Sequence, residues 1–368
     1  MISRFATAVL LAGVFTLALR AQQSDVVIGS VRDGYTVRAC ATDGRTLLER
    51  LHPPEWGQPR WSPQDSHWSL VGVARDGSIV TYQLPVGLQP RATAYDGSDL
   101  VVLSMDMHPH KTPPPGPFYD MLRFDSQGNL LRQQPVNIDF ASSQMAVLPS
   151  GKTIVVGEYL DPGQDDWKRV AAVLDVDGQM LKRTAFPLPP EGGGWVFDSR
   201  RMLAGDGAAY LMLHSYEPPA TGLAKILEDG NIEIKIIPNA PYNDERHHSE
   251  WLFGPDIAVE TYHFVDAHER CTLHFDEYDL NTGERTKSRY AFISGGGFAC
   301  YSGNEVSMIS PSAHVDPARG LAADTLRLVF GKLQDQPVSK PVEDPQACDF
   351  AGIHDNCPVS TAPAAAKP

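Results

Sequence analysis

Two glutamates and one histidine follow glycines at similar sequence separations, and their side chains could bind a metal ion or a polar ligand. The spacing is six or seven residues in the pairs Gly151 and Glu158, Gly207 and His214, and Gly254 and Glu260. Carboxylate oxygens and a neutral imidazole suit a divalent cation or a polar molecule. The same spacing also allows three separate, hydrated side chains. Glu158, His214 and Glu260 are therefore candidate binding residues, which other elements must bring together.

A second candidate site is aromatic. Trp56 and Trp61 lie among prolines and next to Arg60 in the segment "PPEWGQPRW". Indole rings of this kind stack on a sugar ring or on an apolar side chain of a partner protein. Packing beneath the neighbouring prolines is the alternative interpretation.

Several motifs that would indicate catalysis are incomplete. The histidine-rich stretches "ERHHSEW" and "YHFVDAHERCTLH" contain no His-Glu-x-x-His, because Thr272 stands where the second histidine is required. The glycine runs "EGGGW" and "SGGGF" lack the Lys-Ser/Thr that follows a phosphate-binding loop. No Gly-x-Ser-x-Gly nucleophile elbow occurs. The sequence therefore favours binding over catalysis.

The elements that position these residues follow from two interleaved series of glycines. The first series advances by 51, 50, 52 and 53 residues through Gly77, Gly128, Gly178, Gly230 and Gly283. The second advances by 53, 54, 56, 47 and 49 residues through Gly44, Gly97, Gly151, Gly207, Gly254 and Gly303. A repeat of about 50 residues is typical of β-propeller blades.

Each repeat predicts two β-hairpins. Asp-Gly and Ser-Gly steps supply the positive φ of tight hairpin turns, and the flanking segments alternate apolar and polar residues. Two hairpins make a four-stranded antiparallel blade, and six blades are expected to begin near residues 37, 92, 144, 200, 248 and 297. The N-terminal "DVVIGSV" is free to complete the sixth blade. Seven blades are the alternative, if residues 25–40 form an additional unit.

The repeat resembles the six-bladed β-propeller superfamily, including its NHL-like and SMP-30-like (gluconolactonase) members. The resemblance covers roughly residues 25–335 and implies an all-β propeller fold. SMP-30-like enzymes bind a divalent metal in the central channel. Their set of acidic and amide ligands has no match at numbered positions of this sequence.

The ends of the chain predict export. Arg4 and an apolar run of fifteen residues, Phe5 to Leu19, are typical of a signal peptide that ends at Ala21. We expect a signal peptide over residues 1–21, a propeller domain over 22–336 and a Pro/Ala-rich tail over 337–368. The mature chain should contain no transmembrane segment and reside in the periplasm or outside the cell.

The net charge bears on the choice of partner. Residues 1–21 hold Arg4 and Arg20 and no acidic residue, so their removal changes the net charge from −14 to −16. An acidic surface repels the phosphate backbone of nucleic acids, which argues against a nucleic-acid partner.

The sequence contains five cysteines, and in an exported protein they would be in an oxidising compartment, where disulfides persist. Cys348 and Cys357 flank a short polar loop, and we expect them to form a disulfide. The remaining cysteines, Cys40, Cys271 and Cys300, leave one thiol over, and their pairing stays open.

The sequence therefore predicts a non-catalytic binding or scaffold propeller whose ligand is a protein, a peptide or a glycan. The alternative is a metal-dependent, lactonase-like hydrolase with a central carboxylate and histidine site. In either case the segments between second and third strands vary in length and chemistry, which is typical of a binding surface on a rigid scaffold.

Overall fold

The computed structural model describes residues 23–30, 35–50, 67–108, 118–160, 167–189, 193–199, 201–216, 219–237, 250–265, 271–291, 297–315 and 322–335. The predicted signal peptide, Trp56, Trp61, the Cys348–Cys357 pair and the tail lie outside these residues. The described residues form strands and no helix, and so offer no helical segment of a length and apolarity that could cross a membrane.

The strands run in chain order as follows: β1 (Gln23–Ser30), β2 (Tyr35–Cys40), β3 (Thr46–Arg50), β4 (Ser69–Val73), β5 (Ile79–Gln83), β6 (Leu88–Asp96), β7 (Asp99–Asp106), β8 (Tyr119–Phe124), β9 (Leu130–Val136), β10 (Ala141–Val147), β11 (Thr153–Leu160), β12 (Trp167–Leu174), β13 (Met180–Ala185), β14 (Val196–Phe197), β15 (Leu203–Gly205), β16 (Ala208–Tyr216), β17 (Pro219–Leu227), β18 (Ile232–Ile236), β19 (Glu250–Phe253), β20 (Ile257–Val265), β21 (Cys271–Asp279), β22 (Arg285–Ala291), β23 (Gly297–Tyr301), β24 (Glu305–Val315), β25 (Ala322–Lys332) and β26 (Gln334–Asp335).

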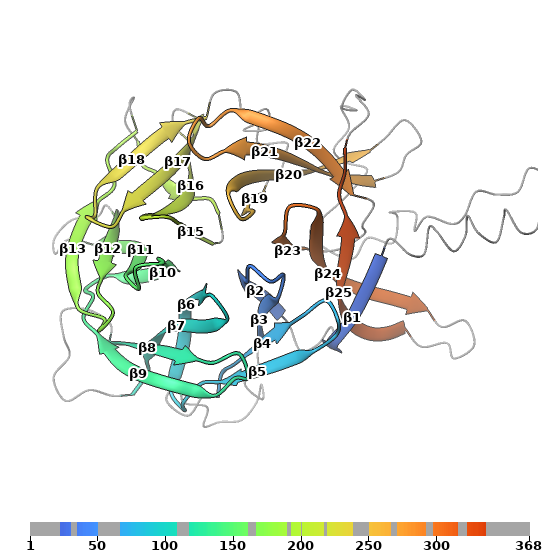
Figure 1. Ribbon diagram of the computed structural model, residues 1–368, viewed down its shortest axis with the longest axis horizontal. Coiled ribbons are helices and arrows are strands. Elements are labelled where there is room, and N and C mark those ends of the chain that lie inside the picture. The colour runs from blue at the N-terminus through green and yellow to red at the C-terminus, as the bar shows by residue number, and fades with distance from the viewer. Residues whose placement is uncertain are drawn as a thin grey trace, which may run out of the picture.

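Six antiparallel sheets surround a common axis, which confirms the six-bladed propeller (Figure 1). Blades one to three are β2–β5, β6–β9 and β10–β13, each ordered from the axis outwards. Blade four is β14–β18, in which both β14 and β15 pair with β16. Blade five is β19–β22 with β26 added outside, and blade six is β23–β25 with β1 as its outermost strand. Residues 25–30 and 35–40 thus belong to blades six and one, and the described residues form no seventh unit.

The glycine series mark the turns that they predicted. All five glycines of the first series lie at positive φ between the third and fourth strands of blades one to five. Five of the six glycines of the second series also have positive φ, between 59° and 85°. Gly254 is the exception: its N–H bonds to the Ile257 carbonyl at 3.0 Å, so that Pro255 and Asp256 occupy the tip of this turn.

The core is divided among the interfaces between blades. Successive side chains of a strand point to opposite faces of its sheet, so each blade packs against both neighbours. Six buried clusters result, one for each interface; Leu47 of blade one, for example, packs with Leu100 and Val102 of blade two. Each blade requires its neighbours, which is why the repeat must be arrayed.

The outer turns also fasten neighbouring blades together. A Cβ atom added at Gly128, in the outer turn of blade two, would lie 2.4 Å from the Thr81 carbonyl oxygen on the outer strand of blade one. The same relation recurs one blade later, where Gly178 lies against Gln134 and Val136. The outer glycine therefore serves two purposes, since it adopts positive φ and permits a close approach to the preceding blade.

Blades six and one are joined twice. Strand β1 pairs with β25 in antiparallel register, from Gln23 opposite Gly331 to Ser30 opposite Thr325. Nearer the axis, a disulfide links Cys40 of β2 to Cys300 of β23. The predicted closure by the N-terminal strand is confirmed, and the structure pairs two of the three cysteines that the sequence left open.

Candidate functional site

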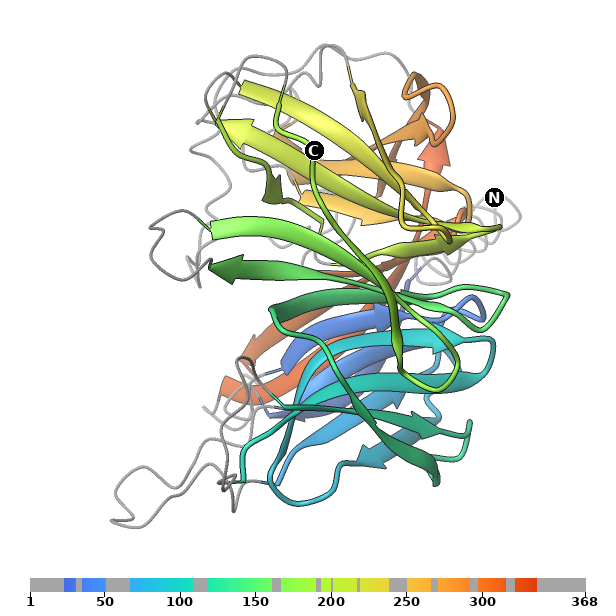
Figure 2. The ribbon, with the colours of Figure 1, turned by 90° about the vertical axis from the view of Figure 1, so that its left-hand side faces the viewer.

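The strand order fixes the face on which binding residues can gather. The strands of a blade alternate in direction, and the glycine turns follow the first and third strands. The second strand of each blade therefore ends on the side of the ring opposite the glycine turns. The second strands are β3, β7, β11, β16, β20 and β24, and we call the side at which they end the second-strand face. The edge-on view shows the strands of each blade running from one side of the ring to the other (Figure 2).

Glu158 lies near the end of β11 and forms an ion pair. Its Oε1 is 3.1 Å from Nη2 of Arg169, the residue directly opposite on β12. The side chains are 38% and 20% exposed, so water screens the pair. Two residues deeper, Val156 and Ala171 pack with Leu213 of blade four. By the alternation of strand residues, the ion pair also faces blade four.

An apolar pair lies next to the ion pair, closer to the second-strand face. Leu160 and Trp167 are opposite each other on β11 and β12 and are 42% and 55% exposed. They lie two residues from Glu158 and Arg169 and therefore point to the same side of the sheet. Trp167 and Arg169 are not among the candidate residues predicted from the sequence. The segment "DDWKRVAAV" contained a signal for them. Trp167, Arg169 and the buried Ala171 are spaced two residues apart, as residues on one face of a strand are.

His214 lies near the end of β16, beside Asp198, which follows β14. Its Nδ1 is 3.4 Å from Oδ1 of Asp198, and its ring packs edge-on against Tyr216 at 4.3 Å between centroids. Neither ring nitrogen has a hydrogen-bond partner among the residues that the structure describes. Tyr216 is 71% exposed, so this pair borders the second-strand face.

Glu260 occupies the matching place on β20 but is only 1% exposed. The Tyr278 hydroxyl donates a hydrogen bond to its Oε2 at 3.0 Å. Burial, together with the neighbouring Glu260 carboxylate, raises the pKa of Tyr278. Opposite Glu260, the fully buried Asp276 accepts hydrogen bonds from Arg285 at 3.0 Å and from Ser288. Glu260 thus belongs to a buried polar network in blade five.

The three sequence candidates point into two different interfaces. Glu158 faces blade four, as shown above. Met212 and Ala258 belong to one cluster between blades four and five, and His214 and Glu260 follow them by two residues, so both point into that interface. Within the described ranges, no three His, Cys, Asp or Glu side chains gather closely enough to hold a metal ion.

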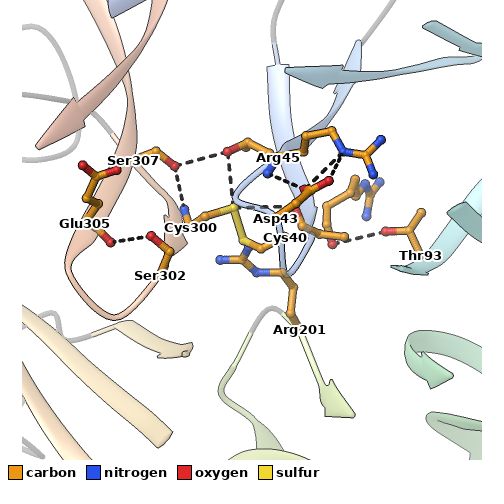
Figure 3. Close-up of a disulfide and its surroundings, with 12 residues drawn as sticks. Cys40, Asp43, Arg45, Thr93, Arg201, Cys300, Ser302, Glu305 and Ser307 are labelled. Atoms are coloured by element: carbon orange, nitrogen blue, oxygen red, sulfur yellow. Dashed lines mark hydrogen bonds and ion pairs between the residues drawn. A yellow bond between two sulfur atoms is a disulfide. The ribbon is translucent and has the colours of Figure 1, made fainter. Parts of the chain in front are cut away.

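Near the axis, polar side chains connect blades. Figure 3 shows Arg201 of blade four extending to the disulfide, with Nη1 3.5 Å from Sγ of Cys300. The Thr46 hydroxyl of blade one lies 3.3 Å from the same sulfur. In blade one, Glu49 is 1% exposed and pairs with Arg38. Burial raises the pKa of Glu49, and the positive charges of Arg38 and Arg91 oppose that shift.

Comparisons with known proteins support the fold alone. No protein-family model and no curated protein matches the chain. A protein of unknown function from Dyadobacter fermentans is 10% identical, with a TM-score of 0.50 over 85% of this chain and 98% of that one. A DUF4221 family member from Bacteroides vulgatus is 9% identical, with a TM-score of 0.43 over 86% and 98% of the two chains. Virginiamycin B lyase from Staphylococcus aureus is 12% identical, with a TM-score of 0.34 over 84% and 99%.

Proposed function

We propose that this protein is an exported, non-catalytic β-propeller that binds a protein, peptide or glycan on the second-strand face of blades three and four. Export is supported by the predicted signal peptide and by the disulfide, because such bonds persist in oxidising compartments.

The observation that carries the proposal is the contrast among matching strand positions. Ser104 in blade two is fully buried and Glu260 in blade five nearly so. In blade three, Glu158 is 38% exposed, and His214 in blade four is 16% exposed. Exposed aromatic residues accompany the latter two, Trp167 beside Glu158 and Tyr216 beside His214. Partly exposed polar groups next to exposed aromatic rings are typical of recognition surfaces.

Glu260 has a supporting role in this proposal. Its hydrogen bond from Tyr278 orders the blade-five wall of the interface into which His214 points. Replacement of Glu260 by alanine should therefore weaken binding less than Glu158→Ala or His214→Ala, and should lower thermal stability more.

The test begins with arrays of peptides and oligosaccharides probed with the exported protein. Affinity for the best ligand is then measured for Glu158→Ala and His214→Ala. Matched controls are Asn129→Ala and Asn231→Ala, because both asparagines lie in outer turns on the opposite side of the ring. Loss of binding in the first two variants and retention in the controls is expected. Loss confined to the turn variants would disprove this location of the site.

Metal analysis addresses the lactonase-like alternative in the same preparations. A stoichiometric divalent ion that is lost in Glu158→Ala, accompanied by hydrolysis of a lactone, would replace the binding proposal with an enzymatic one. We expect neither result.

A further inference from the structure

We infer that blade three carries a subsite for a neutral sugar ring, formed by Glu158, Leu160, Trp167 and Arg169. The inference rests on the proposed function and narrows its ligand to a glycan. We call these four residues the blade-three patch.

The patch is a block of two cross-strand pairs. Glu158 stands opposite Arg169, and Leu160 stands opposite Trp167, on the paired strands β11 and β12. Directly opposite residues on one face of an antiparallel pair have Cβ atoms about 4.5–5.5 Å apart. The ion pair and the indole are therefore neighbours on one surface, held by a regular strand register.

The chemistry of the patch fits a pyranose. One side of a sugar ring presents C–H groups, which pack on an indole face, while its edge carries vicinal hydroxyls. Each hydroxyl both donates and accepts a hydrogen bond. Arg169 provides N–H donors and Glu158 provides carboxylate acceptors, side by side and partly exposed. Two adjacent hydroxyls can use both groups at once, with the ring over Trp167.

Charge favours a neutral glycan over an acidic one. The carboxylate of Glu158 and the guanidinium of Arg169 compensate each other within the patch. The chain as a whole has a net charge of −14, which repels anions. A carboxylated or sulfated sugar would have to compete with Glu158 for the guanidinium and would meet this unfavourable field.

A glycine borders the patch on its blade-four side. Gly194 lies beside Arg169, and a Cβ atom added at this glycine would be 3.5 Å from Nη1 of Arg169. A larger side chain at position 194 would extend over the guanidinium. The next residue, Trp195, is only 3% exposed and packs in the buried cluster between blades three and four, below the patch.

The experiment uses the exported full chain and an array of neutral and acidic oligosaccharides, followed by calorimetry with the neutral oligosaccharide that binds best. Trp167→Ala should weaken binding by about tenfold or more, as expected when one aromatic contact is lost. Trp167→Phe should retain most of the affinity. Leu181→Ala is the matched control, since Leu181 is similarly exposed at 56% but lies on the outer strand β13 of the same blade.

The outcomes separate the two proposals. Neutral-sugar binding that is lost in Trp167→Ala and kept in Leu181→Ala supports the subsite, provided that the variant's melting temperature is unchanged. Peptide binding that depends on Glu158 and His214, without sugar binding, overturns the subsite and leaves the proposed function standing. Sugar binding that Trp167→Ala leaves intact also overturns the subsite. Absence of any ligand on both arrays overturns both proposals.

Discussion

Cys40 and Cys300 are 260 residues apart in the sequence and are joined by a disulfide with Cα atoms 5.7 Å apart. Cys40 ends the innermost strand of blade one, and Cys300 lies in the innermost strand of blade six. At the outside of the ring, β1 is the outermost strand of blade six and precedes β2, the first strand of blade one, in the chain (Figure 1). The ring is thus closed at one seam by a covalent bond near its axis and by a strand at its rim.

Reduction of this disulfide should destabilise the propeller. A native disulfide that closes a long loop contributes about 2–5 kcal/mol, chiefly by restricting the unfolded chain. We expect a lower urea midpoint for the native protein in dithiothreitol, and a similarly low midpoint for Cys40→Ser/Cys300→Ser without reductant. The double variant is also the control for the remaining three cysteines, because reductant should change its midpoint little. Equal midpoints for the native protein with and without reductant would contradict the prediction.

Gly128→Ala should destabilise the protein more than Gly77→Ala. Both glycines lie in outer turns at nearly the same φ, 90° and 87°, so both substitutions incur a positive-φ cost of about 1–2 kcal/mol. At Gly77 an added Cβ meets nothing within 4 Å, whereas at Gly128 it would lie 2.4 Å from the Thr81 carbonyl oxygen. The difference between the two free energies of unfolding, measured in urea, isolates the contact between blades. An equal loss in both variants would show that this contact relaxes without cost.

Stability should fall between about pH 6.5 and pH 4 because of His274. This residue is 5% exposed and stacks on Tyr262 at 5.6 Å between ring centroids. Burial lowers the pKa of His274 from 6.5 to about 4, and the Asp276 carboxylate opposes that shift. Within this window His274 is protonated in the unfolded chain and neutral in the folded protein. The free energy of unfolding therefore decreases as the pH falls.

The expected loss from His274 is about 2–3 kcal/mol between the ends of that window. His274→Gln is the matched variant, because glutamine does not titrate there. Urea midpoints of both proteins at several pH values measure the effect as the difference between them. Parallel pH profiles for the two proteins would rule out His274 as the source.

The exported protein should begin near Gln22. The apolar run ending at Leu19 predicts cleavage after Ala21, and the first described strand begins at Gln23. Cleavage there would leave β1 complete for pairing with β25. N-terminal sequencing of exported protein is the measurement, and recovery of Met1 would contradict both the signal peptide and the predicted boundary.

The residues of the proposed binding site were only partly accessible to sequence reasoning. The glycine register placed Glu158, His214 and Glu260 on second strands, because strand position depends on local turns. It did not distinguish the half-exposed Glu158 from the buried Glu260, because exposure depends on how far each neighbouring blade covers the strand end. It also missed Arg169, whose contact with Glu158 follows from the register of β11 and β12.

The sequence by itself determined the repeating unit of this protein. A glycine at positive φ and an alternating strand are local properties, so Gly128 and its counterparts predicted the hairpins and the blades. The choice between six and seven blades was left open by the sequence and decided by the structure. Only the tertiary structure decided which distant residues meet. Cys40 forms a disulfide with Cys300 because the ring of six blades brings the first and last inner strands together. Gly128 lies close to Thr81 because adjacent blades pack at their outer edges. Such contacts depend on the sum of all interblade packing, which no short segment of the chain encodes.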